Sequence, residues 1–383
     1  MQISLDDKIF SEIGDTADGL SVPAYVVGGY VRDKIIFDQQ ADRDKKTYVH
    51  KDIDIVTVGD GPAFAQAVAQ RLGVRDVHIF RNFGTAMLRH EDRQIEFVGA
   101  RKESYRPDSR KPEVMEGTLE DDLARRDFTI NTIAVSLNRA TRGAVQDPFG
   151  GIADILEKII RTPKDPDITY ADDPLRMLRA ARFSSKLGFR IEKLSFLALC
   201  KNAPRIKIIS MERISEELNK MLLAPVPSVG FKALFEAGLL HLIFPEMTAL
   251  AGVDRREGKM HKDNFFHTLQ VLDNLVKRQE AERPGAGEDE KLWLRWAAVL
   301  HDIAKPATKR FDTTVGWTLH GHEDVGARMV PKIFARLKLP QDEKMRFVQK
   351  LVQLHLRPIA LVDDIVTDSA CRRLLMEAGE DID

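Results

Sequence analysis

The stretch VVGGYVRD at 26–33, followed after a charged spacer by KDIDIVTV at 51–58, decides how this chain is interpreted. Side chains of a strand alternate between its two faces, so Asp52 and Asp54 would project from the same face. Two carboxylates side by side repel each other unless a cation lies between them. Mg²⁺ prefers oxygen ligands and usually takes one or two carboxylates together with substrate phosphates. The pattern therefore predicts a Mg²⁺ site at Asp52 and Asp54.

Two glycines lie upstream of these carboxylates. Gly28 and Gly29 follow the apolar run Tyr25–Val27, and a backbone without Cβ atoms can approach a triphosphate closely. Arg32 follows as a charge partner for phosphate. The alternative is an ordinary Gly-Gly turn before a solvated strand edge, but the combination with the carboxylates favours a phosphate-binding and metal-binding segment.

The composition limits the class of protein. At 383 residues, with 43% hydrophobic and 31% charged residues, the chain is typical of a globular protein with two or three domains. A formal net charge of −1 means that nucleic-acid binding would depend on local basic patches. Two cysteines without metal-ligand spacing indicate a reducing compartment. We find neither a signal-peptide pattern nor an apolar run of membrane-spanning length, so we expect a cytoplasmic protein without membrane association.

Residues 1–150 alternate between strand-like and helical patterns, which predicts a mixed α/β sheet domain. We expect strands at 77–80, 84–90 and 93–100, and helices within 1–20, after the two glycines, at 64–73 ending at Gly73, and over 120–137. Glu96 lies mid-strand and is compatible either with a third carboxylate beside Asp52 and Asp54 or with an exposed side chain, so we do not assign it.

The expected helix over 120–137 contains the adjacent Arg125 and Arg126. Adjacent residues cannot share one helix face. We therefore expect one arginine to point toward a triphosphate and the other to pair with Asp121 or Asp122.

Strand signals fade from residue 152, so the rest of the chain is predicted to be all-α. We divide it into a head at 1–150, a helical neck at 151–225 and a helical body at 226–383. In DDPLRMLRAARF (172–183), Pro174 suits the first turn of a helix and Asp173 its N-cap. Arg176, Arg179 and Arg182 would then follow on one side, at three-residue spacing. The alternative is a capped helix with an exposed basic stripe.

Asp173 and Arg176 together would distinguish nucleobases by their pattern of hydrogen-bond donors and acceptors. A carboxylate accepts and a guanidinium donates, which complements cytosine and adenine, because both present an amine donor beside a ring-nitrogen acceptor. Uracil and guanine reverse this pattern and would leave buried polar groups unpaired. The segment is therefore a candidate for selecting C and A without a template.

A series of motifs in one order carries a family resemblance. They are GGYVRD (28–33), DID (52–54), RRDFTIN (125–131), DPFGG (147–151), DDPLRMLRAARF (172–183) and ERISEELNKML (212–222). Over roughly residues 23–225 the chain resembles class II tRNA nucleotidyltransferases and bacterial poly(A) polymerases. The resemblance implies a nucleotidyltransferase head with a mixed sheet similar to that of DNA polymerase beta, a base-recognising neck, and helical domains that hold tRNA.

The resemblance also implies roles by position. Asp52 and Asp54 would bind the catalytic Mg²⁺ ions. Gly29, Arg32 and Arg126 would contact phosphates or ribose, Asp173 and Arg176 would recognise the base, and Arg179 and Arg182 would line the same nucleotide site. Two departures concern Asp172, where the family usually has Glu, and the spacer between Asp33 and Asp52, which is longer and more charged than usual.

The implied reaction is attack by an RNA 3′-hydroxyl on the α-phosphate of CTP or ATP, which adds CCA to the tRNA acceptor end. The segment HIFRNFGTAML (78–88) has only Arg81 before Gly84. Poly(A) polymerases tend to be more basic there, so the segment favours CCA addition. Poly(A) addition, and addition of CC or A alone, stay open.

A second site is predicted from the histidines, six of which lie between residues 261 and 355. NFFHTL (264–269), LHDIAKP (300–306) and HGHE (320–323) resemble HD-domain phosphohydrolases, which follow the nucleotidyltransferase in many bacterial members of the family. We predict that His267, His301, Asp302 and His322 bind a second divalent metal, of the transition series. The alternatives are a chain that is chiefly an HD-type phosphohydrolase and a retained scaffold without chemistry.

The last segment, DSACRRLLMEAGEDID (368–383), has a helical pattern without a clear cap. We therefore expect the native chain to extend beyond Asp383. No sequence pattern bears on the oligomeric state.

Overall fold

A computed structural model describes residues 2–40, 50–81, 84–104, 113–256, 258–260, 263–360 and 368–379. The chain forms two compact units. Unit 1 comprises Met1–Asp173 with Arg190–Ala198, and unit 2 comprises Pro174–Phe189 with Leu199–Asp383. The predicted boundaries at residues 150 and 225 divide the chain by function, and that division stays a prediction.

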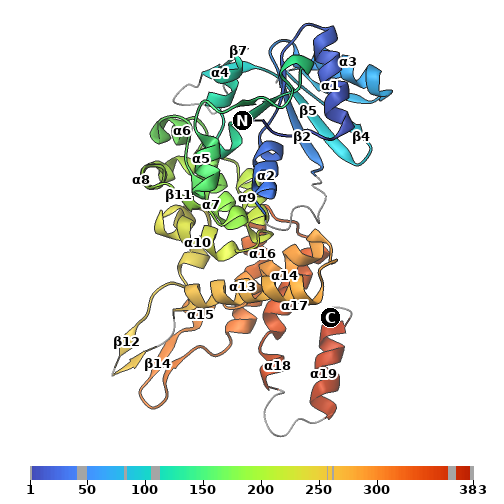
Figure 1. The fold of residues 1–383 in the computed structure, drawn as a ribbon. Coiled ribbons are helices and arrows are strands. Elements are labelled where there is room, and N and C mark those ends of the chain that lie inside the picture. Colours follow the sequence, from blue (N-terminus) through green and yellow to red (C-terminus); the bar gives the residue numbers. More distant parts are fainter. Residues whose placement is uncertain are drawn as a thin grey trace. The chain divides into compact units, whose positions relative to one another are not determined.

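Unit 1 is built on a seven-stranded sheet with the order β3-β4-β5-β2-β1-β8-β9 (Figure 1). Strands β2 and β5 run parallel, and the other neighbouring pairs are antiparallel. This confirms the mixed sheet and the three strands expected between residues 77 and 100. The strands are β1 Ala24–Val27, β2 Asp52–Thr57, β3 Val77–Phe80, β4 Thr85–His90, β5 Arg93–Gly99, β8 Ala134–Ser136 and β9 Val145–Gln146.

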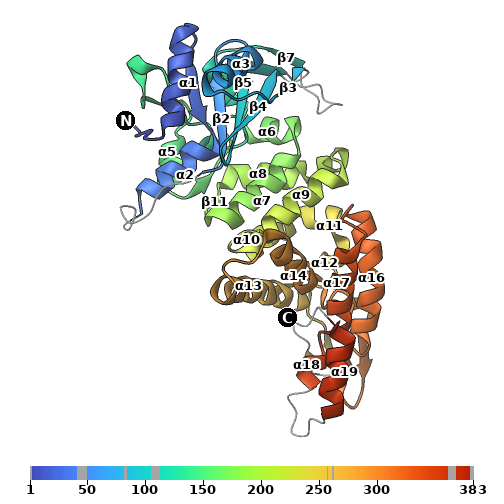
Figure 2. The same ribbon diagram turned by 90° about the vertical axis from the view of Figure 1, so that its right-hand side faces the viewer.

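Helices cover this sheet and bury its apolar side chains. Helix α3 (Gly61–Leu72) packs on β3, β4 and β5 and on α1 (Lys8–Gly19), while α2 (Gly29–Asp38) packs on β1 and β2 (Figure 2). Helix α3 begins after Asp60, whose side chain accepts a hydrogen bond from the amide of Ala63, and ends at the left-handed Gly73, as predicted. The remaining elements of this unit are β6 Arg101–Ser104, β7 Glu113–Glu116, α4 Leu119–Ala124, α5 Gly151–Leu156, β10 Ile159–Ile160, α6 Pro166–Asp172 and β11 Arg190–Ile191, and α8 Lys193–Asn202 begins in it.

The single helix expected over 120–137 is wrong. The chain instead forms α4, a 3-10 turn at Thr129–Asn131 and strand β8. Helix α4 starts with a capping box between Thr118 and Asp121. Beyond it, β-branched residues dominate, which lose side-chain freedom in a helix and fit a strand. Val135 accordingly pairs with Val26 of β1 in the sheet.

Unit 2 is mainly helical. Helix α9 packs against α7 and α14, and α17 packs against α14 and α16 (Figure 2). Trp296 of α14 is fully buried and its indole N–H donates to the side chain of Asn219 on α9 at 2.8 Å. The helices are α7 Leu175–Leu187, α9 Met211–Leu222, α10 Pro227–Glu236, α11 Leu239–Ile243, α12 Pro245–Thr248, α13 Asn264–Glu282, α14 Glu288–Leu300, α15 Lys305–Thr308, α16 His322–Arg336, α17 Glu343–Leu354, α18 Arg357–Ala360 and α19 Asp368–Ala378, with a 3-10 segment at Ala203–Ile208.

The expectation of an all-α second part is wrong in one respect. Two short hairpins interrupt the helices of unit 2, and a third short pair, β10 and β11, lies in unit 1 (Figure 1). Strands of two or three residues are too short to show an alternating pattern in the sequence. The hairpins of unit 2 consist of β12 Arg255–Arg256 with β13 Lys259–Met260, and β14 Arg310–Asp312 with β15 Gly316–Thr318. Among the helices that the structure describes, none is long and apolar enough to cross a bilayer.

Candidate functional site

Strand β2 carries the two predicted carboxylates. Asp52 is its first residue and is exposed, whereas Asp54 is partly buried in the sheet. Asp54 lies between Val27 of β1 and Glu96 of β5, with which it is directly paired in parallel register. Paired residues of neighbouring strands project from the same face. Asp52, Asp54 and Glu96 therefore share one face of the sheet.

Glu96 is the carboxylate that the sequence pattern left unassigned. Burial raises the pKa of Glu96, and repulsion by the charge of Asp54 raises it further, while Arg101 and Arg126 act in the opposite direction. A cation among these carboxylates would relieve the repulsion. The donors are all oxygens, which suits a hard divalent cation. The register of β5 against β2, which brings Glu96 beside Asp54, is a long-range pairing that local pattern does not reveal.

Gly28 marks the point where the backbone comes closest to Asp54. Its φ is +72°, a conformation that favours glycine. A Cβ at this position would lie 2.9 Å from Asp54 Oδ2 and 3.2 Å from Arg126 Nη1. Gly28 is thus packed between a carboxylate and a guanidinium, the two groups that a metal-bound triphosphate requires.

Asp122 of α4 is fully buried and holds both arginines of the RRDFTIN motif. Its Oδ1 accepts from Nε and Nη2 of Arg125 at 2.9 and 2.6 Å, and its Oδ2 accepts from Nε and Nη2 of Arg126 at 3.3 and 3.1 Å. The expectation that only one arginine pairs with an acid is therefore wrong. Asp122 precedes the two arginines by three and four residues, and both spacings allow contact at a helix end.

This arrangement leaves Arg126 oriented toward the carboxylates of β2. Its Nε and Nη2 are bound by Asp122, while its Nη1 lies near Gly28. Burial alone would raise the pKa of Asp122, but the charges of Arg126 and Arg125 hold that pKa below its ordinary value. Asp122 is consequently ionised at neutral pH and positions Arg126.

Arg32 is deeply buried, with 3% of its surface exposed. Its Nη1 donates to Asn131 Oδ1 and its Nε donates to Asp33 Oδ1, each at 2.7 Å. Asn131 in turn donates to Asp127 Oδ1 at 2.9 Å. These bonds fix the start of α2, which carries Gly29, to the segment that follows α4. Asn131 was missed by pattern analysis, although it lies within a quoted motif.

The predicted base-selecting residues lie around the start of α7. Asp173 is extended and ends α6, and Pro174 is the N-cap residue of α7. The expectation that Asp173 is the N-cap is wrong by one position. A residue before proline avoids the helical conformation, which explains the extended backbone of Asp173. Arg176 lies in the first turn of α7 and is partly buried.

Arg179 and Arg182 of α7 are held within unit 2 by Glu217 of α9, which is buried. Arg182 Nε donates to Glu217 Oε2 at 2.6 Å, and Arg179 Nη1 lies 3.8 Å from Oε1. Both guanidiniums also lie over the ring of Phe183, at 5.5 Å for Arg179 and 4.2 Å for Arg182. The two arginines are thus positioned by a buried acid that the sequence pattern did not single out, although it lies in ERISEELNKML.

The four residues of the predicted second metal site come together in unit 2, and His355 joins them. They surround Asp302, which is 2% exposed. Its Oδ2 lies 3.0 Å from Nε2 of His301 and 3.9 Å from Nε2 of His267, while its Oδ1 lies 3.3 Å from Nε2 of His322 and 3.8 Å from Nε2 of His355. The ligand atoms form two groups that share Asp302: one with His267 and His301, the other with His322 and His355.

The hydrogen bonds of these histidines fit metal binding. Nδ1 of His301, His322 and His355 lies 2.7 Å from the main-chain oxygen of Ala298, Leu319 and Val352, respectively. An imidazole that donates from Nδ1 to a carbonyl presents a lone pair at Nε2. Nε2 of His322 and of His355 is buried and has no hydrogen-bond partner among the described residues. Imidazole and carboxylate ligands suit a borderline divalent metal.

Asp302 is kept ionised by its neighbours. Burial would raise the pKa of Asp302, but His301, His322 and Lys305 together hold it well below its usual range. Lys305 Nζ donates to Asp302 Oδ2 at 2.6 Å. Conversely, the contact with Asp302 raises the pKa of His322.

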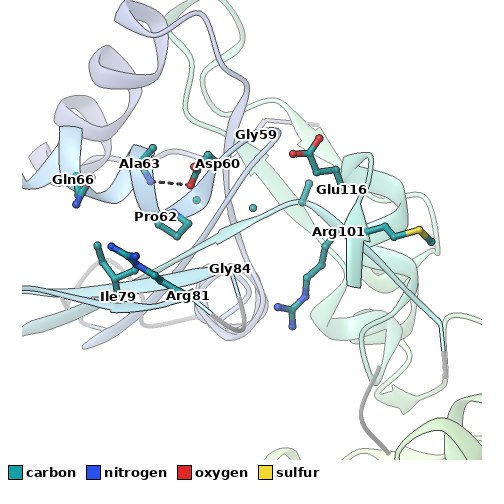
Figure 3. Close-up of a pocket in the computed structure, with 14 residues that line it drawn as sticks. Gly59, Asp60, Pro62, Ala63, Gln66, Ile79, Arg81, Gly84, Arg101 and Glu116 are labelled. Carbon is teal, nitrogen blue, oxygen red and sulfur yellow. Dashed lines mark hydrogen bonds between the residues drawn. The ribbon is translucent and has the colours of Figure 1, made fainter. Parts of the chain in front are cut away.

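A separate pocket of about 630 Å³ opens beyond the other end of β2 (Figure 3). The figure shows Asp60 capping the amide of Ala63 at the start of α3, with Arg81 nearby. None of the predicted site residues lines this pocket. Its lining consists of Gly59, Asp60, Gly61, Pro62, Ala63, Gln66, Ile79, Arg81, Gly84, Gly99, Ala100, Arg101, Met115 and Glu116.

Three family models match successive parts of the chain. They describe a poly A polymerase head domain over residues 24–161, a probable RNA and SrmB-binding site of polymerase A over 188–250, and an HD domain over 264–376. The first covers the seven-stranded sheet, and the third covers all five residues of the Asp302 cluster.

Two curated proteins are similar to the chain in sequence. An A-adding tRNA nucleotidyltransferase of Deinococcus radiodurans is 37% identical over 244 residues, which cover 62% of this chain and 52% of that protein. A multifunctional CCA protein of Shewanella frigidimarina is 34% identical over 334 residues, which cover 83% of this chain and 70% of that protein. The chain thus spans about half of the first relative and 70% of the second.

Solved structures agree with the fold. A tRNA nucleotidyltransferase crystallised with a primer tRNA and an incoming ATP analogue has a TM-score of 0.68 at 22% identity, and the match covers 97% of this chain and 92% of that one. A Thermotoga maritima CCA-adding enzyme complexed with tRNA has a TM-score of 0.63 at 23% identity, with 97% and 79% coverage. The matched head and HD domains and the relative that is 34% identical show that the chain belongs to the family of tRNA nucleotidyltransferases and bacterial poly(A) polymerases.

Proposed function

We propose that this chain completes the CCA end of tRNA from CTP and ATP without a template. The observation that carries the proposal is the grouping of Asp54, Glu96, Gly28 and Arg126, where two carboxylates, a close backbone approach and a guanidinium meet at one strand. In the reaction, the RNA 3′-oxygen forms a bond to the α-phosphorus. The bond between that phosphorus and the bridging oxygen of the β-phosphate breaks, and pyrophosphate leaves.

Different residues of the head contribute to different parts of this reaction. Divalent cations, which we propose to be Mg²⁺, stabilise the charge on the attacking and leaving oxygens when bound at Asp52 and Asp54. Gly28 and Gly29 allow the triphosphate to approach the start of α2, where Arg32 is fixed by Asn131. Arg126, oriented by Asp122, neutralises phosphate charge. Positioning and charge neutralisation together supply most of the catalysis in this class of reaction.

The choice of nucleotide is proposed to lie with Asp173 and Arg176. Their acceptor and donor groups complement the shared pattern of cytosine and adenine and oppose that of uracil and guanine. Arg179 and Arg182 are proposed to line the nucleotide site, in positions that Glu217 fixes. The RNA partner is proposed to be the tRNA acceptor end, and a cytoplasmic location is proposed because tRNA is the substrate.

The proposal must be tested for which nucleotides the chain adds to tRNA: C and A, or A alone. Relatives of this chain include A-adding enzymes as well as multifunctional CCA proteins. Transcripts of one tRNA that end before CCA, before CA and before the final A would each be incubated with one nucleotide at a time. We expect C to be incorporated into the first two and A only into the third. Incorporation of A without C would identify an A-adding enzyme, and long A runs would identify a poly(A) polymerase.

A second candidate activity belongs to unit 2. The buried Nε2 atoms of His322 and His355, beside an ionised Asp302, favour a transition metal there and a metal-dependent phosphohydrolase. A metal at this cluster would supply a polarised water, while Lys305 carries a positive charge next to the carboxylate. The test is release of phosphate from a phosphomonoester, which should disappear with Asp302→Ala.

A further inference from the structure

The two hairpins of unit 2 form one surface, which we call the hairpin platform (residues 253–256 and 258–260 with 309–318). The two hairpins, labelled by β12 and β14, lie side by side in Figure 1. Strand β13 contacts β15, and the guanidinium of Arg256 lies 4.6 Å from the ring centre of Phe311. Lys309 of the second hairpin forms an ion pair with Asp254 of the first. These contacts hold the two hairpins side by side, although the paired residues Asp254 and Lys309 are more than fifty residues apart in the sequence.

Aromatic rings lie within this basic surface. Phe311 and Trp317 are a directly paired cross-strand couple with ring centres 5.2 Å apart and planes at 71°. The ammonium of Lys309 lies 5.3 Å from the Trp317 ring. Arg256 thus lies beside the ring of Phe311, and Lys309 lies beside the ring of Trp317. Both contacts are within the distance of a cation–π interaction.

The platform carries unbalanced positive charge. Arg255, Arg256 and Arg310 are exposed, and neither Arg255 nor Arg310 forms an ion pair with a described residue. The nearby acids have other roles, because Asp254 pairs with Lys309 and Asp312 accepts the amides of Thr314 and Val315 in the turn. Large apolar side chains are exposed on the same hairpins, namely Met260 at 60% and Val315 at 70%.

Cations that follow a phosphate backbone, interleaved with aromatic rings on which bases stack, are the features of a single-stranded nucleic-acid site. A duplex would offer only its phosphates to such a surface. We propose that the hairpin platform binds single-stranded RNA. The site lies outside residues 188–250, to which the matched family model attributes probable RNA binding.

The platform also adjoins the Asp302 cluster along the chain. Strand β13 leads into α13, which carries His267, and β15 leads into α16, which starts at His322. Lys305, which contacts Asp302, lies on α15 immediately before β14. Both hairpins thus adjoin, along the chain, elements that carry residues of the cluster. RNA binding at the platform does not depend on either proposed activity.

Tryptophan fluorescence offers a test that is local to the platform. The chain has three tryptophans, and Trp293 and Trp296 are buried in α14, whereas Trp317 is partly exposed. Titration of the full chain with oligo(U) should quench the emission of Trp317, and Trp317→Phe should remove that quenching. Because Trp293 and Trp296 are buried, the quenching that is lost in Trp317→Phe reports on the platform.

The cations are tested with the double variant R255A/R310A. Each lost phosphate contact should weaken binding by about fivefold at ~0.1 M salt, and the log–log salt slope should fall by about 0.7 per contact. R328A/K332A, which removes two exposed cations of α16, is the matched control and should behave like the wild type.

Two outcomes would overturn the proposal. One is an absence of quenching of the wild-type protein by oligo(U), which needs no variant and so does not depend on folding. The other is that R255A/R310A, shown by circular dichroism to be folded, binds RNA with the same affinity and the same salt slope as R328A/K332A. Quenching that persists in a protein found inactive in CCA addition would leave the platform proposal standing.

Discussion

Gly28 is packed between the carboxylate of Asp54 and the guanidinium of Arg126. A Cβ on this residue would displace Asp54 Oδ2 or Arg126 Nη1, and its φ of +72° would strain any side chain. We predict that Gly28→Ala lowers kcat for C incorporation by about 100-fold, because a shift of about 1 Å at a reacting centre costs that much. The measurement is single-nucleotide incorporation into tRNA that lacks CCA.

Gly73→Ala is the matched control for this prediction. Gly73 has almost the same φ, +69°, but nothing lies within 4 Å of the position of its Cβ. This variant should lose about 1–2 kcal/mol of stability from backbone strain and retain its kcat. Equal kcat values for both alanine variants would show that the contact of Gly28 with Asp54 does not matter for the reaction.

His355 provides a second prediction at the residue scale. Its Nε2 is buried beside Asp302, and burial lowers the pKa of His355, which keeps the ring neutral and able to bind a metal. We predict that His355→Ala weakens metal binding by more than the ~10–100-fold that loss of an outer-shell partner costs. Metal content of purified protein, measured by mass spectrometry, checks this. His241→Ala, which removes an exposed histidine of the same unit, should keep the wild-type metal content.

At the scale of elements, α4 depends on Asp122, because this buried carboxylate holds Arg125 and Arg126 at the end of the helix. Its folded-state pKa is lowered, so it stabilises the fold fully above its unfolded pKa of about 3.9, and this contribution is lost as the pH falls through the lower folded pKa. We predict that Asp122→Asn costs about 3 kcal/mol at pH 7, because it leaves two arginines without their buried partner. Urea unfolding at a series of pH values measures this cost.

The same pH series can also contradict the proposed role of the Asp122 charge. The difference in unfolding free energy between wild type and Asp122→Asn should shrink as the pH falls below about 4, where the Asp122 carboxyl of the unfolded chain takes up a proton while that of the folded chain is still ionised. A difference that stays constant down to about pH 2 would refute the role of the charge. Asp121→Asn, which affects only the capping box of the same helix, should cost much less than Asp122→Asn, because Asp121 is not buried.

Elements also show what the sequence could and could not predict. Strand β2 and helix α3 were predictable, because alternation and caps are local signals. Strand β8 was not, because its conformation depends on pairing with β1, and the hairpins of unit 2 are too short to show a period. The same division applies to the sites: motifs gave Asp54 and Asp302, whereas Asn131, Glu217 and His355 owe their roles to partners that only the fold brings close. For Asp122, a local pairing with one arginine was expected, but not the pairing with both.

At the scale of the whole molecule, the two candidate metal sites belong to different compact units. Asp52, Asp54 and Glu96 lie in unit 1, and the Asp302 cluster lies in unit 2. Their ligands differ in kind as well, since one set offers oxygens and the other offers chiefly imidazole nitrogens. The two centres should therefore respond differently to both mutation and metal replacement.

Removal of metal by a chelator should abolish both nucleotide incorporation and phosphate release. We predict that Mg²⁺ restores incorporation, whereas phosphate release from a phosphomonoester returns only with a transition metal such as Mn²⁺, Co²⁺ or Ni²⁺, because imidazole ligands favour these ions over Mg²⁺. Asp54→Ala should abolish incorporation of both C and A while phosphate release persists, and Asp302→Ala should do the reverse. If either variant abolished both activities although its circular dichroism were unchanged, the two centres would have to act as one, and the assignment of a separate chemistry to each unit would be wrong.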